Sequence, residues 1–528
     1  MKRFLFSLLA LLPLARLTQA QQFTWTRTEP VDVPFYHRMV RYASAADAAG
    51  NVTVAGFHSQ PWFVSIVALG TIQLVSYSST GGARFRQQWT GRAEILRLHY
   101  DAAGSLLVLG NFQDSLQLAP GHTLRGHAAA PAPFLAKLDA TGQLQWAHSL
   151  PALLGGSLLE CEALTTDPAT AIYLGGQQLG GGTAVWQVPA TGQAPAVRLL
   201  QQPQVARISS LSLGRNGDLF VAGSCARPLT SFNGQGPPVG DGYNVYLARY
   251  TAAGALRWAR FAADATCPST YAVADNHGGV YWTGGLPMDG MQFGPWRADG
   301  RHVGGDHFLV RLDTAGTWRW LRQTPGNPLH NGLYPAHSGG LGVDATGNAL
   351  LLGTLVGTLP NGTAARASDP VLLSYDPAGT LRWAQSGGGP DEDEAHSLAL
   401  APNGVAYLAG YTRNGPLRFG TTQAVPTTAT SLFVAQLQEA RPAATRPGQD
   451  GQWQVAPNPA HGSTQVVFGA GSPPPASLTL HNVLGELVRQ VPVSAATVQV
   501  PTTGLAPGLY LLRAAAGTTW YQARLLVE

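Results

Sequence analysis

The stretches FLVRLDTAGTWRW, residues Phe308–Trp320, and GLGVDATGNALLLG, residues Gly340–Gly353, decide the fold of this chain. Each joins two short apolar runs through a turn sequence, Asp-Thr-Ala-Gly in the first and Asp-Ala-Thr-Gly in the second. An Asp caps its own turn, and a Gly adopts the positive φ that such a turn requires. In the related stretch Phe134–Asp139, residues alternate as they do in a half-buried strand. Each stretch therefore predicts a β-hairpin.

The first hairpin recurs along the chain at a fixed spacing. An apolar or aromatic residue is followed by a glycine eight residues later and by a tryptophan twelve residues later, in the sets Phe134, Gly142, Trp146; Tyr246, Gly254, Trp258; Phe308, Gly316, Trp320; and Val371, Gly379, Trp383. Two weaker copies lie near Gly81 and Gly192, and a seventh begins at Phe433 but ends before its tryptophan strand. A period of tens of residues indicates a repeat architecture.

The second hairpin is equally regular. Two glycines six residues apart enclose a short apolar strand, in the pairs Gly50 and Gly56, Gly104 and Gly110, Gly217 and Gly223, Gly278 and Gly284, Gly347 and Gly353, and Gly404 and Gly410. Four of these pairs have an Asp three residues before the first glycine, namely Asp47, Asp101, Asp275 and Asp344. A degenerate copy at Asp167–Gly175 has Ala-Thr-Ala in place of the turn glycine, which brings the count to seven.

The strand missing from the last repeat has a counterpart at the other end of the chain. The sequence Phe23-Thr-Trp25-Thr-Arg27 resembles Leu-Arg-Trp-Ala-Arg at Leu256–Arg260. An N-terminal strand that completes the last repeat closes a ring, and closure removes edge strands that invite aggregation. We therefore predict an all-β fold, a seven-bladed β-propeller over residues 21–440. A β-solenoid or a pair of sandwiches explains a strand missing at one end and present at the other less well.

Length and composition bound the remaining alternatives. A chain of 528 residues is longer than one typical domain. Charged residues make up only 12%, and the chain holds 63 Gly and 38 Pro, which suits an all-β protein with many tight turns. The formal net charge of +4 is small for this length and is not clustered, so the sequence does not favour nucleic-acid binding.

The N-terminus reads as a secretory signal peptide over residues 1–20. Lys2 and Arg3 supply a positive start, Phe4–Leu14 is an apolar run, and Thr18-Gln19-Ala20 is a small-residue cleavage site. The apolar run is too short to span a bilayer in the mature protein, and no other long apolar segment follows. We expect an exported protein whose mature chain has no integral membrane segment.

The C-terminal part changes character after a polar linker at residues 441–452. Residues 453–528 contain six or seven short alternating strands, which favours a small β-sandwich. This region resembles the type A C-terminal sorting domain of proteins exported by the type IX secretion system. The resemblance rests on Pro457, Asn458, Pro459, the run Leu478–Gly485 with Asn482 and Gly485, the run Leu505–Tyr510 with Gly508 and Tyr510, and the terminal run that starts at Arg524.

This resemblance implies recognition by the type IX secretion machinery, export across the outer membrane, removal of the tail, and release or attachment at the cell surface. The final Glu528 and an Arg where family members often carry Lys depart from the pattern. The alternative is a carbohydrate-binding or immunoglobulin-like module. The hairpins themselves resemble the SBBP family of bacterial β-propeller repeats over about residues 40 to 440. That family's motifs are structural and imply no catalytic residues.

Three long connections, at residues 111–133, 224–244 and 285–307, are rich in Gly, Pro and Asp. Long loops on a rigid ring often carry binding function, and the alternative is plain extended hairpin tips. The three cysteines are Cys161, Cys225 and Cys267. Export permits disulfides, so we predict a Cys225–Cys267 bond with Cys161 left free, against the alternative of three buried thiols.

The one dense acidic run is Asp391-Glu392-Asp393-Glu394, in a Gly-rich stretch. Asp391 and Asp393 are candidate Ca²⁺ ligands, but the spacing that points alternate carboxylates inward is absent, and a solvated loop is the alternative. No nucleophile elbow, phosphate-binding loop or zinc-binding helix motif appears, so no residue is predicted as catalytic or cofactor-binding. The repeated Asp residues are explained by the turns.

These observations predict a secreted or cell-surface protein that is a non-catalytic binding module for a polysaccharide, an envelope component or a protein. Two alternatives stay open, an extracellular glycan hydrolase or lyase on a propeller scaffold and a structural surface component. Paired carboxylates with perturbed pKa values in the central channel would favour the enzyme. An exposed aromatic platform would favour glycan binding, and a bare polar face would favour the structural role.

Overall fold

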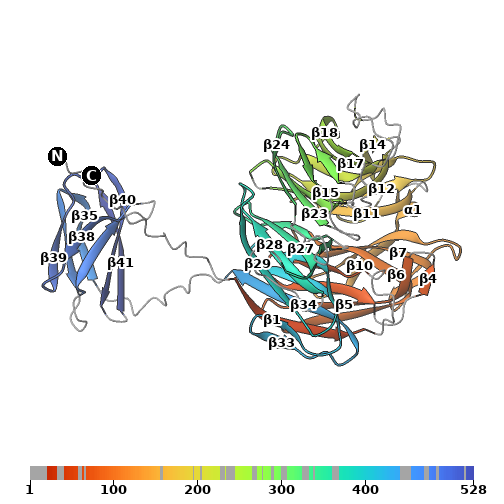
Figure 1. Cartoon of the computed structure of the whole chain (residues 1–528), viewed down its shortest axis with the longest axis horizontal. Coiled ribbons are helices and arrows are strands. Elements are labelled where there is room, and N and C mark those ends of the chain that lie inside the picture. The colour runs from red at the N-terminus through yellow and green to blue at the C-terminus, as the bar shows by residue number, and fades with distance from the viewer. Residues whose placement is uncertain are drawn as a thin grey trace, which may run out of the picture. The chain divides into compact units, whose positions relative to one another are not determined.

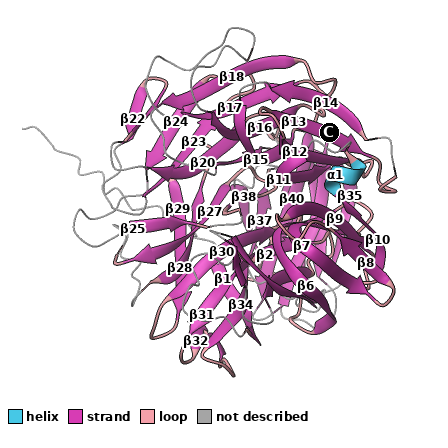
Figure 2. Cartoon of the chain, turned by 90° about the vertical axis from the view of Figure 1, so that its right-hand side faces the viewer, coloured by secondary structure: helices cyan, strands magenta, loops and turns pink. Residues whose placement is uncertain are grey.

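The computed structural model describes residues 21–528 except residues 32–40, 58–61, 65–66, 155–157, 194–195, 203–204, 226–231, 233–243, 264–269, 276, 287–289, 299–305, 324–331, 337–338, 359–367, 440–452, 469–474, 483–486 and 517–518. The predicted signal peptide and linker therefore lie outside the described residues. Figure 2 shows that the described chain consists almost wholly of strands, with one short helix, α1 (Leu150–Leu153). The all-β fold class is confirmed.

The repeated turns fold as their sequence predicts. Asp344 Oδ1 accepts hydrogen bonds from the backbone nitrogens of Thr346 and Asn348 at 2.9 Å each, and Gly347 has a φ of +86°. In the degenerate copy, Thr170 stands at the glycine position and is held at a φ of +70°. A β-branched residue is strained in this region of φ, so the surrounding hairpin imposes the turn on it.

The hydrogen-bonded strand order contains successive antiparallel runs of four strands, which we call blades and number in chain order. Blade 1 comprises β2 (Ala43–Ala46), β3 (Val52–Phe57), β5 (Val67–Tyr77) and the first half of β6 (Ala83–Tyr100), with the short β4 (Trp62–Val64) at its edge. Blade 2 comprises the second half of β6, β7 (Leu106–Ala119), β9 (Ala132–Leu138) and β10 (Leu144–Ser149), with β8 (His122–Arg125) paired to β7.

The next three blades follow the same pattern. Blade 3 comprises β11 (Leu158–Thr166), β12 (Ile172–Gln178), β13 (Thr183–Val188) and β14 (Val197–Gln202). Blade 4 comprises β15 (Val205–Leu213), β16 (Leu219–Cys225), β17 (Asn244–Tyr250) and β18 (Leu256–Ala263). Blade 5 comprises β19 (Thr270–Ala274), β20 (Val280–Leu286), β23 (Asp306–Leu312) and β24 (Trp318–Gln323); the hairpin β21 (Met291–Phe293) and β22 (Trp296–Ala298) extends its long connection.

Two more blades complete the set among the described strands. Blade 6 comprises β25 (Gly332–Pro335) and β26 (Leu341–Val343), both paired with β27 (Ala349–Val356), followed by β28 (Asp369–Tyr375) and β29 (Leu381–Gly388). Blade 7 comprises β30 (Asp393–Leu400), β31 (Ala406–Arg413), β34 (Thr430–Glu439) and β1 (Gln21–Pro30); its extended hairpin is β32 (Leu417–Phe419) and β33 (Thr422–Ala424). This strand order supports the predicted count of seven blades, which stays an interpretation.

The first strand of each blade contacts the first strand of the next blade, in the order β2, the second half of β6, β11, β15, β19, β26 and β30, and β30 contacts β2 again. These inner strands therefore form a closed ring around an axis, as in a propeller. The ring is closed by β1, which pairs with β34 from Gln21 opposite Glu439 to Pro30 opposite Ser431. Figure 1 shows β1 and β34 side by side, although they come from opposite ends of the segment Gln21–Glu439.

The hydrophobic core of the blades consists of several clusters, which lie between neighbouring blades, and not of a single central cluster. One cluster joins strands of blades 4 and 5 and includes Trp282, Phe293 and Phe308, each fully buried. Phe293 belongs to the β21–β22 hairpin in the predicted connection 285–307, and this residue pairs with Ala262 of β18 in blade 4. This connection is therefore partly structural, and so is the connection 111–133, where β7 and β8 form an extended hairpin. Most of the connection 224–244 lies outside the described residues.

The repeated Asp residues of the turns have a second role in holding the blades. Lys137 Nζ lies 2.8 Å from Asp101 Oδ2, and Arg311 Nη2 lies 2.8 Å from Asp275 Oδ2. The Lys137 and Asp101 side chains are 8% and 1% exposed, so this pair is buried. In both blades the basic residue on the third strand therefore neutralises the Asp in the turn between the first and second strands.

Replacing Lys137 by Met is expected to lower the free energy of unfolding by about 3–5 kcal/mol, because Asp101 then carries a buried, uncompensated charge. The measurement is the urea midpoint followed by circular dichroism. The double variant Lys137→Met with Asp101→Asn is the control, since Asn keeps an oxygen for the turn and removes the charge. It should recover much of the loss. An unchanged midpoint for Lys137→Met alone would contradict this role.

The C-terminal strands form a separate sandwich. One sheet contains β35 (Trp453–His461), β36 (Ser463–Phe468) and β39 (Thr497–Pro501); the other contains β37 (Ser477–His481), β38 (Leu487–Pro492), β40 (Gly508–Ala516) and β41 (Thr519–Val527). Their inner faces share one apolar core that includes Val466, Leu478 and Leu512. By its contacts the chain divides into two units, of which Gln21–Glu439 is one. Among the described helices, none has the length and apolarity to cross a membrane.

Candidate functional site

Charged side chains from several inner strands meet in one place, which we call the axial cluster: Arg41, Glu94, Arg97, Glu162 and Arg207. Arg41 Nη1 lies 3.4 Å from Glu162 Oε1, and Arg207 Nε donates to Glu162 Oε2 at 2.9 Å. Arg41 lies two residues before the start of β2 of blade 1, whereas Glu162 lies on β11 of blade 3. Side chains from blades two positions apart meet only near the axis of a ring.

A second pair of contacts supports this placement. Arg97, on the inner half of β6, donates from Nη2 to the Ser209 carbonyl of blade 4 at 3.4 Å. The Arg97 guanidinium also lies over the Tyr271 ring of blade 5, 5.1 Å from its centroid. The axial cluster therefore links inner strands of five consecutive blades across the central channel.

The two buried carboxyl groups of the axial cluster differ in their acidity. Burial raises the pKa of Glu94, although Arg41 and the Asn111 amide, which donates to Glu94 Oε1 at 2.8 Å, oppose the shift. Burial also acts to raise the pKa of Glu162, but the charges of Arg41 and Arg207 outweigh it, and the pKa of Glu162 is lowered. Two neighbouring carboxyl groups whose pKa values are shifted in opposite directions are an arrangement suited to acid–base chemistry.

The axial cluster also fits a purely structural role. Glu162 is paired with two arginines from other blades, so the ion pairs tie inner strands together. None of these residues was predicted as functional, because they stand outside the repeated turn and tryptophan positions. Their signal was the presence of charged residues among the apolar ones of a first strand, as at Glu94 and Arg97 in AEILRLHY, residues 93–100.

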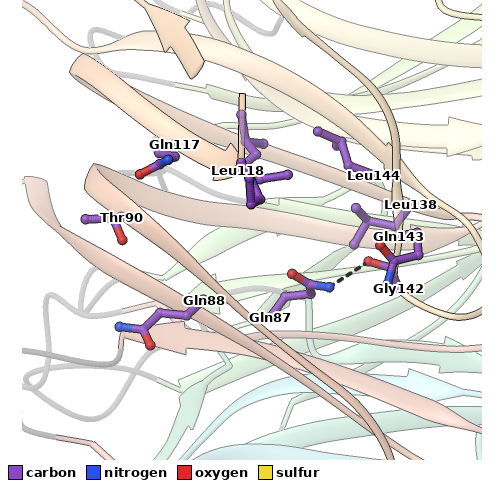
Figure 3. Close-up of a pocket in the computed structure, with 11 residues that line it drawn as sticks. Gln87, Gln88, Thr90, Gln117, Leu118, Leu138, Gly142, Gln143 and Leu144 are labelled. Carbon is purple, nitrogen blue, oxygen red and sulfur yellow. Dashed lines mark hydrogen bonds between the residues drawn. The ribbon is translucent and has the colours of Figure 1, made fainter. Parts of the chain in front are cut away.

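A cavity with a volume of about 420 Å³ lies between blades 1 and 2. We call it the glutamine pocket, because its walls carry the glutamines Gln87, Gln88, Gln117 and Gln143. β6 supplies one wall, the end of β7 a second, and the turn between β9 and β10 a third (Figure 3).

The chemistry of the glutamine pocket is polar but uncharged. Gln87 Nε2 donates to the Gly142 carbonyl at 3.1 Å, as the dashed line in Figure 3 shows, and this bond fixes one amide. Within the described residues, no hydrogen bond is recorded for the side chains of Gln88, Gln117 and Gln143, which are exposed. Leu118 and Leu144 add apolar surface, and none of the residues lining the pocket is ionisable. Amides both donate and accept, so this lining matches the hydroxyl groups of a neutral ligand.

The acidic run is only partly a loop, because Asp393 and Glu394 belong to β30. Asp393 is fully buried, and burial, with a further contribution from Asp369, raises its pKa to about 6. Asp391 is exposed and accepts a hydrogen bond from Asn414 Nδ2 at 3.0 Å. The two candidate Ca²⁺ ligands therefore lie in different environments. Among the described residues, no group of three or more His, Cys, Asp or Glu is arranged to hold a metal ion, and Ca²⁺ binding stays a prediction.

Cys161 and Cys225 are buried, and neither is bonded to another cysteine among the described residues. Burial raises the pKa of Cys225 to about 12, so its thiol is protonated and unreactive at neutral pH. Cys267 lies outside the described residues. The predicted Cys225–Cys267 bond has no counterpart among the described residues and stays a prediction.

The C-terminal motif residues meet at the terminal strand. Asn458 Nδ2 donates to the Arg524 carbonyl at 2.7 Å, and the Leu526 nitrogen donates to Asn458 Oδ1 at 2.9 Å. Tyr510 is buried, and its hydroxyl donates to the Ala506 carbonyl at 2.8 Å, closing the turn before Gly508. Pro457 and Pro459 flank Asn458 on β35, Asn482 follows β37, and Gly485 lies outside the described residues.

Residues 454–528 match the family model of the secretion system C-terminal sorting domain. The C-terminal domain is a sorting domain. It belongs to the type IX secretion system, and it indicates that the protein is secreted or displayed at the cell surface. The sorting domain also indicates an interaction with the secretion machinery. The alternative of a carbohydrate-binding or immunoglobulin-like module is set aside by this match.

Comparison of the whole fold with solved structures finds remote likenesses. One is to a europium-containing methanol dehydrogenase, with 13% identity and a TM-score of 0.30 over 75% of this chain and 86% of that chain. Another is to the extracellular domain of a putative one component system from B. thetaiotaomicron, with 10% identity and a TM-score of 0.24 over 91% of this chain and 78% of that chain. No curated protein sequence shows significant similarity to this chain.

Proposed function

We propose that this secreted or cell-surface protein is a non-catalytic binding module whose glutamine pocket holds a neutral glycan. Residues 1–20 direct its export as a signal peptide, the sorting domain completes delivery, and the blades are of the SBBP repeat type. The observation that carries the proposal is the lining of the pocket, which offers four amides and no ionisable group. A site without an ionisable acid or base can bind a sugar but lacks the groups that acid–base cleavage of a glycosidic bond requires.

The dimensions and the polarity of the pocket support the same conclusion. A volume of about 420 Å³ falls within the range of small-ligand sites. No aromatic residue is among the exposed large hydrophobic residues of the described chain, so a stacking platform does not supply the affinity. Hydrogen bonds from Gln88, Gln117 and Gln143 must supply it, and such bonds favour hydroxyl-rich ligands over apolar ones.

The double variant Gln88→Ala with Gln117→Ala is expected to weaken retention on a neutral polysaccharide about tenfold, because each lost hydrogen bond contributes about 0.5–1.5 kcal/mol. The measurement is affinity electrophoresis of the purified mature protein against a panel of neutral and acidic polysaccharides. EDTA should not change retention, because the pocket lining holds no carboxylate.

The matched control is Gln423→Ala, which removes an exposed glutamine from β33 of blade 7. It should bind as the parent protein does. Equal retention of the double variant and the parent would remove the glutamine pocket as the site. Absence of retention on every polysaccharide would instead favour a protein partner or a structural surface component.

A second candidate, an extracellular glycan hydrolase or lyase, is favoured by the axial cluster. Glu94 and Glu162 have pKa values shifted in opposite directions at the ring axis, which is the arrangement expected of a channel-centred enzyme. The same incubations discriminate the two candidates when the supernatant is scored for released oligosaccharides. Product formed by the parent but not by Glu94→Gln would establish the enzyme, and its absence would leave the cluster a structural link between blades.

A further inference from the structure

Neighbouring blades are held together by a repeated contact between the outer strand of one blade and a turn of the next. In blade 4, Trp258 Nε1 donates to the Thr314 carbonyl at 3.0 Å, and Arg260 Nε donates to the Gly316 carbonyl at 2.7 Å. Gly316 has a φ of +75°, and a Cβ built on it would lie 2.7 Å from the Trp258 ring. We call this arrangement the tryptophan clamp.

The tryptophan clamp recurs with different turns. In blade 5, Trp320 Nε1 donates to the Pro377 carbonyl at 2.9 Å, and Arg322 Nε donates to the Gly379 carbonyl at 2.6 Å. In blade 7 the same bonds run from Trp25 to the Ser79 carbonyl at 3.1 Å and from Arg27 to the Gly81 carbonyl at 3.0 Å. The three turns differ in their side chains but share a glycine at the fourth position, so the clamp recognises backbone shape.

Blade 1 shows that glutamine can replace the arginine of the clamp. Phe85 and Gln87 occupy the two clamp positions in blade 1. Their register against β5 is the same as the register of Trp258 and Arg260 against β17. Gln87 Nε2 still donates to a turn glycine carbonyl, that of Gly142, at 3.1 Å. The position two residues after the aromatic residue can therefore carry either Arg or Gln as the hydrogen-bond donor.

Blade 6 carries the clamp residues Trp383 and Gln385 on β29, but the described residues of blade 7 offer them no turn. The two outer strands of blade 7 are β34 and β1, and they come from opposite ends of the unit, with Gln21 directly opposite Glu439. Among the described residues, none joins these two strands at that edge. Within the described residues Trp383 Nε1 is buried and has no hydrogen-bond partner.

A cavity of about 170 Å³ lies at this seam between blades 6 and 7. Its lining includes Trp383, Leu437 of β34, the first turn of blade 6 from Asp344 to Thr346, and the first turn of blade 7 from Pro402 to Gly404. At the blade 5 clamp the first turn of the next blade lies beside the clamp turn, since a Cβ built on Gly347 would lie 3.6 Å from Pro377. At this seam the buried indole N–H of Trp383 lacks an acceptor among the described residues.

We propose that this seam is a docking site for a β-turn of a partner protein with a glycine at the fourth position of the turn. The Trp383 indole donates to a carbonyl inside the turn, its ring packs on the glycine, and Gln385 donates to the glycine carbonyl as Gln87 does within the chain. The glycine is required because the turn needs a positive φ and because any Cβ would collide with the indole ring.

The test uses the full mature chain with ¹⁵N-labelled tryptophan and a cyclic peptide that copies residues 311–318, the Arg-Leu-Asp-Thr-Ala-Gly-Thr-Trp turn of blade 5. The peptide should shift the indole N–H resonance of Trp383, which is assigned by its loss in Trp383→Phe. This variant keeps an aromatic ring and removes the donor, so it should weaken peptide binding about fivefold, the value of one net hydrogen bond.

Two controls make the result decisive. Trp320→Phe is the same substitution at an occupied clamp and should leave peptide affinity unchanged. A peptide with Val in place of the turn glycine should not bind. The proposal is overturned if the glycine peptide shifts no tryptophan resonance, if Trp383→Phe binds it as tightly as the parent, or if Trp320→Phe weakens binding equally.

Discussion

Deletion of residues 21–30 is expected to prevent the blades from forming a stable ring. β1 is the fourth strand of blade 7, and it buries Phe23 and Trp25, which are 2% and 6% exposed. Loss of two such side chains costs about 3–5 kcal/mol each, and β34 is left as a bare edge. The sum reaches the whole stability of a typical protein, about 5–15 kcal/mol. Size-exclusion chromatography and circular dichroism should show aggregated or unfolded protein.

A milder variant keeps this prediction testable when the deletion yields no soluble material. Trp25→Ala should fold but lose about 3–5 kcal/mol in urea unfolding, because Trp25 packs against Tyr77 and Tyr407 with ring centroids 5.8 Å apart. Gln22→Ala, on an exposed position of the same strand, should unfold as the parent does. A deletion protein that remains monomeric and unfolds at the parent's urea concentration would show that the ring closes without β1.

Removal of residues 454–528 is expected to abolish delivery to the cell surface and to leave the protein in the periplasm. The deleted residues are the sorting domain, which the secretion machinery must recognise. The strands of Gln21–Glu439 form their own unit, so the ring should still fold and accumulate. Cell fractionation with an antibody against the blades measures the result. Surface or medium levels equal to those of the parent would contradict a sorting role.

Asn458→Ala should reproduce part of this loss. Its side chain joins β35 to β41 through the Arg524 carbonyl and the Leu526 nitrogen, so its removal loosens the terminal strand by about 1–3 kcal/mol. Gln490→Ala on β38 is a control in the same domain, because Gln490 bonds only at the surface, to Ser477 Oγ at 3.2 Å. Export of Gln490→Ala at parental levels with reduced export of Asn458→Ala would tie delivery to this contact.

Local sequence was sufficient for the hairpins, the ring closure and the sorting domain. A turn such as Asp344–Gly347 is made by four adjacent residues, so its chemistry is readable without knowledge of the rest of the chain. The strand Phe23–Arg27 was recognisable because ring closure requires the same tryptophan pattern that the other outer strands carry. The sorting motifs were readable for a similar reason, since they recur in order at a fixed place in the chain.

The tertiary structure alone decided where side chains from distant repeats meet. Arg41 and Glu162 are 121 residues apart, and no local pattern brings them together; only the closing of the ring places both at its axis. Asp393 reads as part of a solvated acidic run, yet it begins β30 and is buried in the blade, while Asp391, which precedes the strand, stays exposed. The open clamp at Trp383 follows from the ring as well, since it exists only because the strands that meet there come from the two ends of the unit and leave one turn unmade.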